Sequence, residues 1–280
     1  MDATPAPAAS SARRRPHRYR DPLAEVDLDR LDKTQPWLPE ELVSLAGLAQ
    51  WRALDAPVRL RLAQLEFVAL ADLGLWLEAH LLRHLGRAAP KVRRLGAEAY
   101  AAQLAELREE AGHSLMFLEL LRRSPCALPG DLPRPRLAAA FAGRLGAWSG
   151  LFWGCVLIGE TVATELNRRT RDAAGVPAVV RDIAGLHFAD EVRHVAYARL
   201  RVADAFARRP HRLAGAVLRP LARQYIEACF YPPASLYAAA GAPDPRHLAR
   251  AARANPARQA LAATCLAPAR RFLAGRGVAI

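Results

Sequence analysis

Two short stretches of the sequence carry the same arrangement of acidic and histidine side chains. Glu109-Glu110-Ala111-Gly112-His113 and Asp190-Glu191-Val192-Arg193-His194 each place a glutamate three residues before a histidine, with a second acidic residue directly before that glutamate. On an α-helix, the glutamate and histidine of such a Glu-x-x-His motif lie one turn apart, so both can bind one metal ion. A single motif arises often by chance and can be an exposed polar pair, whereas two in one chain indicate a paired metal site.

The second motif is preceded by a further histidine, His187, four residues before Glu191. At 100° per residue, His187, Glu191 and His194 fall within about 60° of one another on a helix. The same face continues with apolar residues: Val180, Ile183, Ala184 and Ala198. Three potential ligands on one apolar stripe are therefore expected to point into the protein interior.

Two further carboxylates interrupt apolar stretches elsewhere in the chain. The neighbours of Glu78 at helical spacing are all apolar: Phe67, Leu70, Ala71, Gly74, Leu75, Leu81, Leu82 and Leu85. Glu160 lies within the stretch LFWGCVLIGETVATEL. Because an unpaired buried charge is very costly, both carboxylates need a partner. The predicted metal ligands are Glu78, Glu110, His113, Glu160, His187, Glu191 and His194.

Several polar residues fall on the side of the first helix away from Glu78, among them Glu66, His80 and His84. His80 and His84 are four residues apart and could bind a metal together. The charged neighbours of these residues favour a solvent-exposed face instead. We therefore expect this side of the helix to lie outside the site.

The distribution of proline predicts the elements that hold the ligands. The chain has 21 prolines, yet residues 58–89, 91–124, 136–176 and 178–209 contain none. Proline in a helix interior costs about 3 kcal/mol, and strand-forming residues are scarce, so each window predicts one long helix. The ligands are divided among all four windows.

The division of the ligands among the helices indicates the fold. A glutamate from each of two helices, together with a Glu-x-x-His motif from each of the other two, is the arrangement of di-iron and di-manganese carboxylate proteins. The four negative charges of the glutamates would balance two divalent ions. The fold class predicted is all-α, a ferritin-like four-helix bundle with additional short N- and C-terminal helices.

The order Glu78…Glu110-x-x-His113…Glu160…His187-x-x-x-Glu191-x-x-His194 resembles the bacterial p-aminobenzoate (arylamine) N-oxygenases, a non-haem di-iron family. That family has a third histidine four residues before the last ligating glutamate, whereas ferritins and acyl-carrier desaturases typically lack it. The resemblance covers roughly residues 35–230. It implies two iron ions, O₂ as co-substrate, and oxidation of an aryl-amine through the hydroxylamine towards the nitro group.

The resemblance suggests a homodimer, and the basic ends of the chain suggest an external, acidic electron donor of the ferredoxin or reductase type. Metal-bound histidines usually donate their other N–H group to a carboxylate. In related di-iron bundles the acidic residue before each ligating glutamate supports the histidine of the opposite helix. We therefore expect Asp190 to support His113 and Glu109 to support His194; the alternative is that both are surface acids.

The domain organisation predicted is a disordered, basic and proline-rich tail (1–34) followed by one helical domain (35–280). Within the domain, the bundle core spans about residues 57–209, and accessory helices occupy 211–280, in the segments 211–229, 245–254 and 257–274. Pro39-Glu40-Glu41-Leu42 begins a short leading helix.

Composition restricts the class of function. The formal net charge is +13, but its excess lies at the two ends, with five Arg and one Asp in residues 1–20 and seven Arg and one Asp in residues 241–280. We therefore expect no nucleic-acid groove along the fold. No apolar run is long enough for a membrane span, and four scattered cysteines favour a reducing cytoplasm.

Three alternatives to an N-oxygenase remain at this stage. A di-iron hydroxylase or desaturase acting on C–H bonds needs the same cluster. An iron-handling protein would store or detoxify metal without an organic substrate, although His187 would hold iron in place rather than release it. A helical adaptor with basic tails would leave the inward carboxylates as unexplained buried charge.

Overall fold

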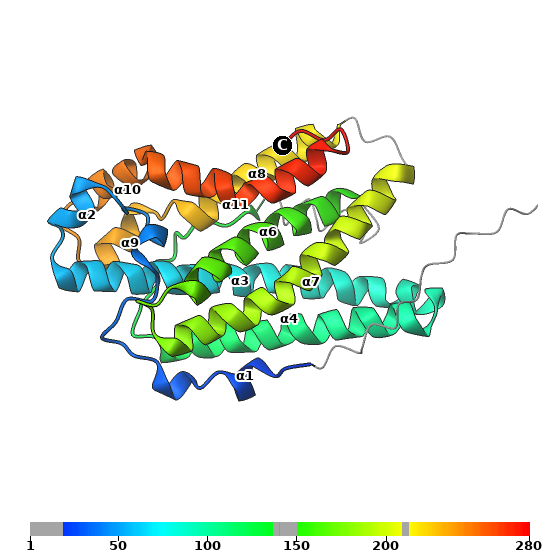
Figure 1. The fold of residues 1–280 in the computed structure, drawn as a ribbon, viewed down its shortest axis with the longest axis horizontal. Helices are drawn as coiled ribbons and strands as arrows, with labels where there is room; N and C mark the ends of the chain where they lie inside the picture. Colours follow the sequence, from blue (N-terminus) through cyan, green and yellow to red (C-terminus); the bar gives the residue numbers. More distant parts are fainter. Residues whose placement is uncertain (1–18, 137–139, 141–149, 209–212) are drawn as a thin grey trace, which may run out of the picture.

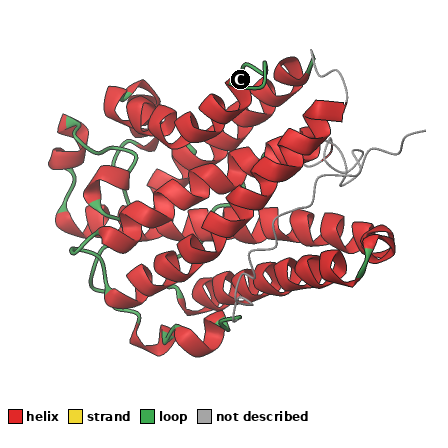
Figure 2. Ribbon diagram, turned by 45° about the vertical axis from the view of Figure 1, so that its right-hand side comes forward, coloured by secondary structure: helices red, strands yellow, loops and turns green. Residues whose placement is uncertain are grey.

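The structure is a computed structural model that describes residues 19–136, 140, 150–208 and 213–280. Across these residues every regular element is a helix, as Figure 2 shows. The buried apolar side chains form one contiguous core that extends from Val26 to Val278. The predicted all-α, ferritin-like fold is confirmed.

Four long helices form the bundle: α3 (Ala56–Val92), α4 (Ala97–Arg123), α6 (Gly150–Asp172) and α7 (Ala178–Arg208). They contain 37, 27, 23 and 31 residues, which is long for a globular protein. The most extensive helix contacts pair α3 with α4 and α6 with α7. Each pair is an antiparallel hairpin, and the two hairpins pack on each other (Figure 1). Residues 137–139 and 141–149 of the third predicted window lie outside the described residues.

The turn between α3 and α4 differs from the prediction. The sequence predicts a helix end at Pro90, yet α3 continues through this proline to Val92 and is followed by a short 3₁₀ turn, η3 (Arg93–Leu95). Proline is tolerated so near a helix end because little of the backbone hydrogen-bond ladder remains to be lost. The chain reverses at Gly96, whose φ of 120° is a conformation that L side chains rarely adopt.

Additional helices cover the bundle on the side away from α4 (Figure 1). The C-terminal ones are α8 (Ala214–Phe230), α9 (Ala234–Ala239), α10 (Pro245–Ala254) and α11 (Pro256–Ala274). Helices α8 and α11 both contact α6, and each contains an internal proline. Helix α9 was not predicted, because it begins directly after the Pro232-Pro233 pair that punctuates the sequence. Two short N-terminal elements, η2 (Glu40–Leu42) and α2 (Ala49–Ala53), stand where a single leading helix was predicted.

The predicted tail boundary at residue 34 is wrong for residues 19–34. These residues form α1 (Pro22–Glu25) and the 3₁₀ turn η1 (Leu28–Arg30), and α1 packs on α4. Val26, Leu28 and Leu31 are buried. A Cβ atom at Gly112 would lie 2.9 Å from the Tyr19 hydroxyl, so this glycine of the first motif admits the N-terminal segment. Residues 1–18 lie outside the described part of the chain.

A buried polar cluster attaches the C-terminal helices to α3. Glu66 of α3 was expected to be exposed, but it is only 3% exposed. It accepts hydrogen bonds from the backbone N–H and the hydroxyl of Ser44, and Arg258 of α11 lies 3.8 Å away. Burial raises the pKa of Glu66, while Arg258 and Ser44 oppose this rise. Arg258 also donates to the carbonyl oxygens of Leu42 and Phe230. The cluster therefore joins three distant parts of the chain.

Replacing Arg258 with methionine is expected to destabilise the protein by about 3–5 kcal/mol, because Glu66 would remain buried without its cation. Urea unfolding followed by circular dichroism measures the free energy. The matched control is Arg270→Met on the exposed side of the same helix, with an expected change of less than about 0.5 kcal/mol. Equal stability of the two variants would contradict this role of the cluster.

Candidate metal centre

The structure brings six of the seven predicted ligands together in the bundle core. Glu78 comes from α3, Glu110 and His113 from α4, and His187, Glu191 and His194 from α7; all six are buried. Their donor atoms form two groups, each within 4.8 Å: the first is Glu78, His113, His187 and Glu191, and the second is Glu110, Glu191 and His194. Because Glu191 belongs to both groups, the arrangement suits two neighbouring cations that share one carboxylate.

The nitrogen atoms facing this cluster are surrounded by carboxylate oxygens. His113 Nδ1 lies 3.4 Å from Glu110 Oε2 and 3.8 Å from both Glu78 Oε1 and Glu191 Oε1. His194 Nδ1 lies 3.0 Å from Glu110 Oε1 and 3.7 Å from Glu191 Oε2. His187 Nε2 lies 2.8 Å from Glu191 Oε1 and 3.7 Å from Glu78 Oε1. Three imidazoles thus present one nitrogen each to the same small volume.

Most of these inward atoms make no hydrogen bond. Both carboxylate oxygens of Glu110 and of Glu191, and the Nδ1 atoms of His113 and His194, are buried without a hydrogen-bond partner of acceptable geometry. Buried polar atoms are otherwise almost always hydrogen-bonded. Imidazole nitrogens combined with carboxylate oxygens are a donor set that suits iron, manganese and zinc. The residues present therefore fit a metal centre.

The outer nitrogens of two histidines are held by carboxylates of the opposite helix. His113 Nε2–H donates to Asp190 Oδ2 at 3.1 Å, and His194 Nε2–H donates to Glu109 Oε2 at 3.1 Å. With the proton on Nε2, each imidazole directs its Nδ1 lone pair into the cluster. These are the two pairs anticipated from the repeated motif, and their effect on metal binding stays a prediction.

Sequence reasoning missed two polar side chains that touch this network. Arg193 Nη2 lies 3.0 Å from Glu109 Oε1 and 2.7 Å from Asp190 Oδ1, so one cation bridges both supporting carboxylates. Arg193 follows Asp190 by three residues on α7, and this spacing in the sequence could have predicted their contact. Asn167 of α6 lies 2.7 Å from His187 Nδ1 through its amide, and no local pattern indicates this contact.

Several groups of the cluster have pKa values raised above their usual range, so metal binding has to displace protons from them. Burial opposes positive charge on His113, but Asp190, Glu110 and Glu78 together hold its pKa well above the usual value. The carboxylates around His194 raise its pKa in the same way. Burial and the neighbouring Glu110 raise the pKa of Glu78 well above its usual value. Metal binding to such a cluster releases protons, because only deprotonated groups are ligands.

Glu160 stands apart from the other predicted ligands. It is half-buried on α6 and belongs to neither group of converging donor atoms. It does line a cavity together with Glu78 and His187. Its position beside the cluster is compatible with a ligand whose side chain turns inward, and that role stays a prediction.

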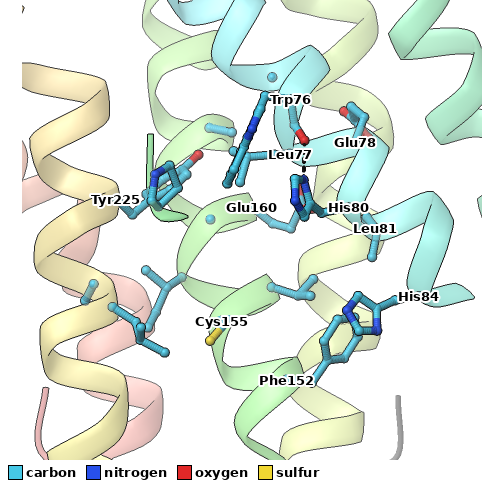
Figure 3. A pocket seen from close by; sticks show the side chains of 18 of the residues that line it. Trp76, Leu77, Glu78, His80, Leu81, His84, Phe152, Cys155, Glu160 and Tyr225 are labelled. Atoms are coloured by element: carbon cyan, nitrogen blue, oxygen red, sulfur yellow. Dashed lines mark hydrogen bonds between the residues drawn. The ribbon is translucent and has the colours of Figure 1, made fainter. Parts of the chain in front are cut away.

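A cavity of about 130 Å³ borders the cluster, between α3, α6 and α8. Its wall is mostly apolar, and the rings that line it include Trp76, Phe152, Tyr225, His80 and His84 (Figure 3). The prediction that His80 and His84 are solvent-exposed is wrong: His84 is buried and His80 is half-buried. Helix α3 contacts α4 and also α8 within the bundle, so more than one of its faces is covered.

Comparison with protein families agrees with the metal-binding geometry of the site. The model of the p-aminobenzoate N-oxygenase AurF family matches residues 3–277. The chain belongs to this family. The match to the N-oxygenase family extends beyond residues 35–230, on which the sequence resemblance rested, and includes the C-terminal helices. No curated protein matches the sequence.

The N-oxygenases are di-iron enzymes, and the buried histidine and glutamate groups described above are able to bind metal. In the described part of the chain, no helix is long and apolar enough to cross a membrane.

Replacing Asp190 with asparagine is expected to lower metal affinity by about 10- to 100-fold, because the amide no longer fixes the proton on His113 Nε2. Competition with a chromophoric chelator measures the affinity. Asp182→Asn is the matched control, since Asp182 is exposed on the same helix, and its affinity should be that of the wild type. Wild-type affinity in Asp190→Asn would show that this carboxylate does not support a ligand.

Proposed function

We propose that the protein is a non-haem di-iron oxygenase that uses O₂ to oxidise the nitrogen of an aryl-amine, first to the hydroxylamine and then towards the nitro group. The observation that carries this proposal is the position of the unpartnered donor cluster at the wall of the 130 Å³ apolar cavity. An engineered apolar cavity of about 150 Å³ binds benzene, so the space suits one aromatic ring.

The proposed ligand set follows the two motifs. Glu110 with His113, and Glu191 with His194, would anchor the two irons. Glu78 and Glu160 would complete the set, and His187 would be the additional nitrogen donor. When bound, the iron pair supplies the electron transfer and O₂ activation that no side chain can provide.

The side chains around the cavity position the substrate. The indole of Trp76 and the ring of Phe152 offer flat apolar surfaces to an aromatic ring. Glu78 and His187 belong to both the donor cluster and the cavity wall, so the amine would lie beside them. Figure 3 shows Glu78 and Glu160 in this wall. Holding the amine there converts a bimolecular encounter into a reaction within one complex. Burial raises the pKa of Tyr225 well above its usual value, so its hydroxyl stays a neutral donor in the cavity wall.

Two alternative functions share the metal cluster. A hydroxylase or desaturase would oxidise C–H bonds in the same cavity, and only a substrate panel separates it from an N-oxygenase. An iron-handling protein has no use for an apolar cavity beside its metal site, so the cavity favours an enzyme with an organic substrate.

The partners and the location are also proposals. Conversion of an amine to a hydroxylamine by O₂ needs two electrons and two protons, because the second oxygen atom leaves as water. We therefore include an electron donor of the ferredoxin or reductase class. The free cysteines Cys126, Cys155, Cys229 and Cys265 support a cytoplasmic location, and family resemblance supports a homodimer.

Protein produced with iron is expected to hold about two iron ions per chain, as in other di-iron bundles, and to convert aryl-amines in the presence of O₂ and a reductant. Metal analysis gives the iron content. Mass spectrometry with ¹⁸O₂ shows whether oxygen from O₂ is added at nitrogen. Intact folding without iron would reject the di-iron proposal, whereas rapid oxidation of many irons per chain without product would favour iron handling.

Glu160→Ala separates the role of this residue from general effects on α6. If Glu160 is a ligand, the variant should lose iron and all turnover. The matched control is Glu165→Ala, five residues later on the same helix, where the carboxylate pairs with Arg168 and Arg169. This control should keep both iron and activity, and full iron loading of Glu160→Ala would remove Glu160 from the ligand set.

A further inference from the structure

One side chain of the cavity wall, His84, is buried without a polar partner. It is 5% exposed and lies on α3, six residues after Glu78, which corresponds to about 9 Å along the helix axis. Its ring packs against Phe152 of α6, with ring centroids 4.6 Å apart, at the end of the cavity away from Glu78 (Figure 3). Among the described residues, no hydrogen-bond partner reaches the imidazole of His84.

His80, one turn earlier on α3, provides a direct contrast. It also lines the cavity, but its Nδ1–H donates to the carbonyl oxygen of Trp76 at 2.8 Å, and its ring packs on the Trp76 indole. Among the residues that the structure describes, His80 therefore has a hydrogen-bond partner and His84 has none. Because His84 lines the cavity and its ring nitrogens make no hydrogen bond to the described residues, they are available to a polar group of a ligand that enters the cavity.

The surroundings of His84 indicate the chemistry of that partner. Burial, followed by the nearby cations Arg87 and Arg83, lowers the pKa of His84, so the imidazole is neutral and carries one N–H donor. Both arginines are exposed on the surface beside this end of the cavity, and their positive charges favour an anion there over a cation. A neutral N–H donor near two cationic side chains suits a hydrogen-bond acceptor, and a negatively charged acceptor most of all.

We propose that His84 is a specificity residue that donates a hydrogen bond to the ring substituent opposite the amine of the substrate. The aryl-amine then spans the cavity, with its amine at Glu78 and His187, its ring beside Trp76 and Phe152, and an acceptor substituent at His84. The separation of about 9 Å along α3 suits a para-substituted ring with a polar contact at each end. This inference rests on the proposed function, since it assumes that an aryl-amine occupies the cavity.

The test uses two ligands of similar shape that differ in the substituent opposite the amine. p-Aminobenzoate has a carboxylate there, and p-toluidine has a methyl group. Calorimetry on the iron-loaded protein should show that wild type binds p-aminobenzoate about 10- to 100-fold more tightly than p-toluidine, as expected for a hydrogen bond to a charged group. His84→Phe should remove this preference without weakening p-toluidine binding.

Two further variants exclude a merely structural effect. His84→Gln retains an N–H donor and should recover part of the preference, whereas His80→Phe should leave it unchanged because the hydrogen bond of His80 is made to Trp76. Thermal unfolding verifies that each variant is folded, and His84→Leu replaces His84→Phe if the larger ring is not accommodated.

The possible outcomes separate this inference from the proposed function. A wild-type preference that persists in His84→Phe or His84→Leu, or the absence of any preference in wild type, overturns the role of His84. Because binding is measured apart from turnover, failure to oxidise any amine would reject the N-oxygenase proposal, while a His84-dependent binding preference would still support the contact.

Discussion

The burial of three carboxylates and three imidazoles in one small volume is the constraint on which the rest of the structure depends. Glu78, Glu110 and Glu191 cannot remain ionised side by side in a bundle core without positive charge, and protons on the neighbouring histidines supply only part of it. The arrangement is therefore that of a protein built around cations. Four long helices are the simplest scaffold that presents such ligands inward from three or more directions.

The two central helices support each other's ligands. Asp190 on α7 orients His113 on α4, Glu109 on α4 orients His194 on α7, and Arg193 contacts both acids. This reciprocity determines which ring nitrogen of each histidine faces the cluster. It also couples the distance between α4 and α7 to the positions of the donor atoms. The packing of these two helices therefore affects the chemistry of the site.

Polar residues of helix α3 acquire partners through tertiary packing that the helical pattern of the sequence does not predict. Its Glu78 belongs to the buried donor cluster, its Glu66 lies beside Arg258 of the C-terminal helices, and its His84 lines the apolar cavity. A hydrophobic stripe predicts that one face of a helix is buried, and this prediction is correct for a helix at the surface of a small bundle. Here accessory helices cover additional faces, so polar residues that look solvent-exposed in the sequence are buried, and each is left with a specific partner or with a cavity.

The sequence by itself determined the helical class, the four long elements and the identity of the candidate ligands. Proline positions, helical spacing and the two Glu-x-x-His motifs are local properties, and the period of the α-helix converts them directly into faces and neighbours. Only the tertiary structure decided the contacts of Asn167, Arg258 and His84 and the burial of Val26, Leu28 and Leu31. It also decided the position of Glu160 outside the two donor groups and the cavity beside them. These features depend on segments far apart in the chain, and the physical reason is that burial and hydrogen-bond partners are set by packing between helices, which no local periodicity specifies.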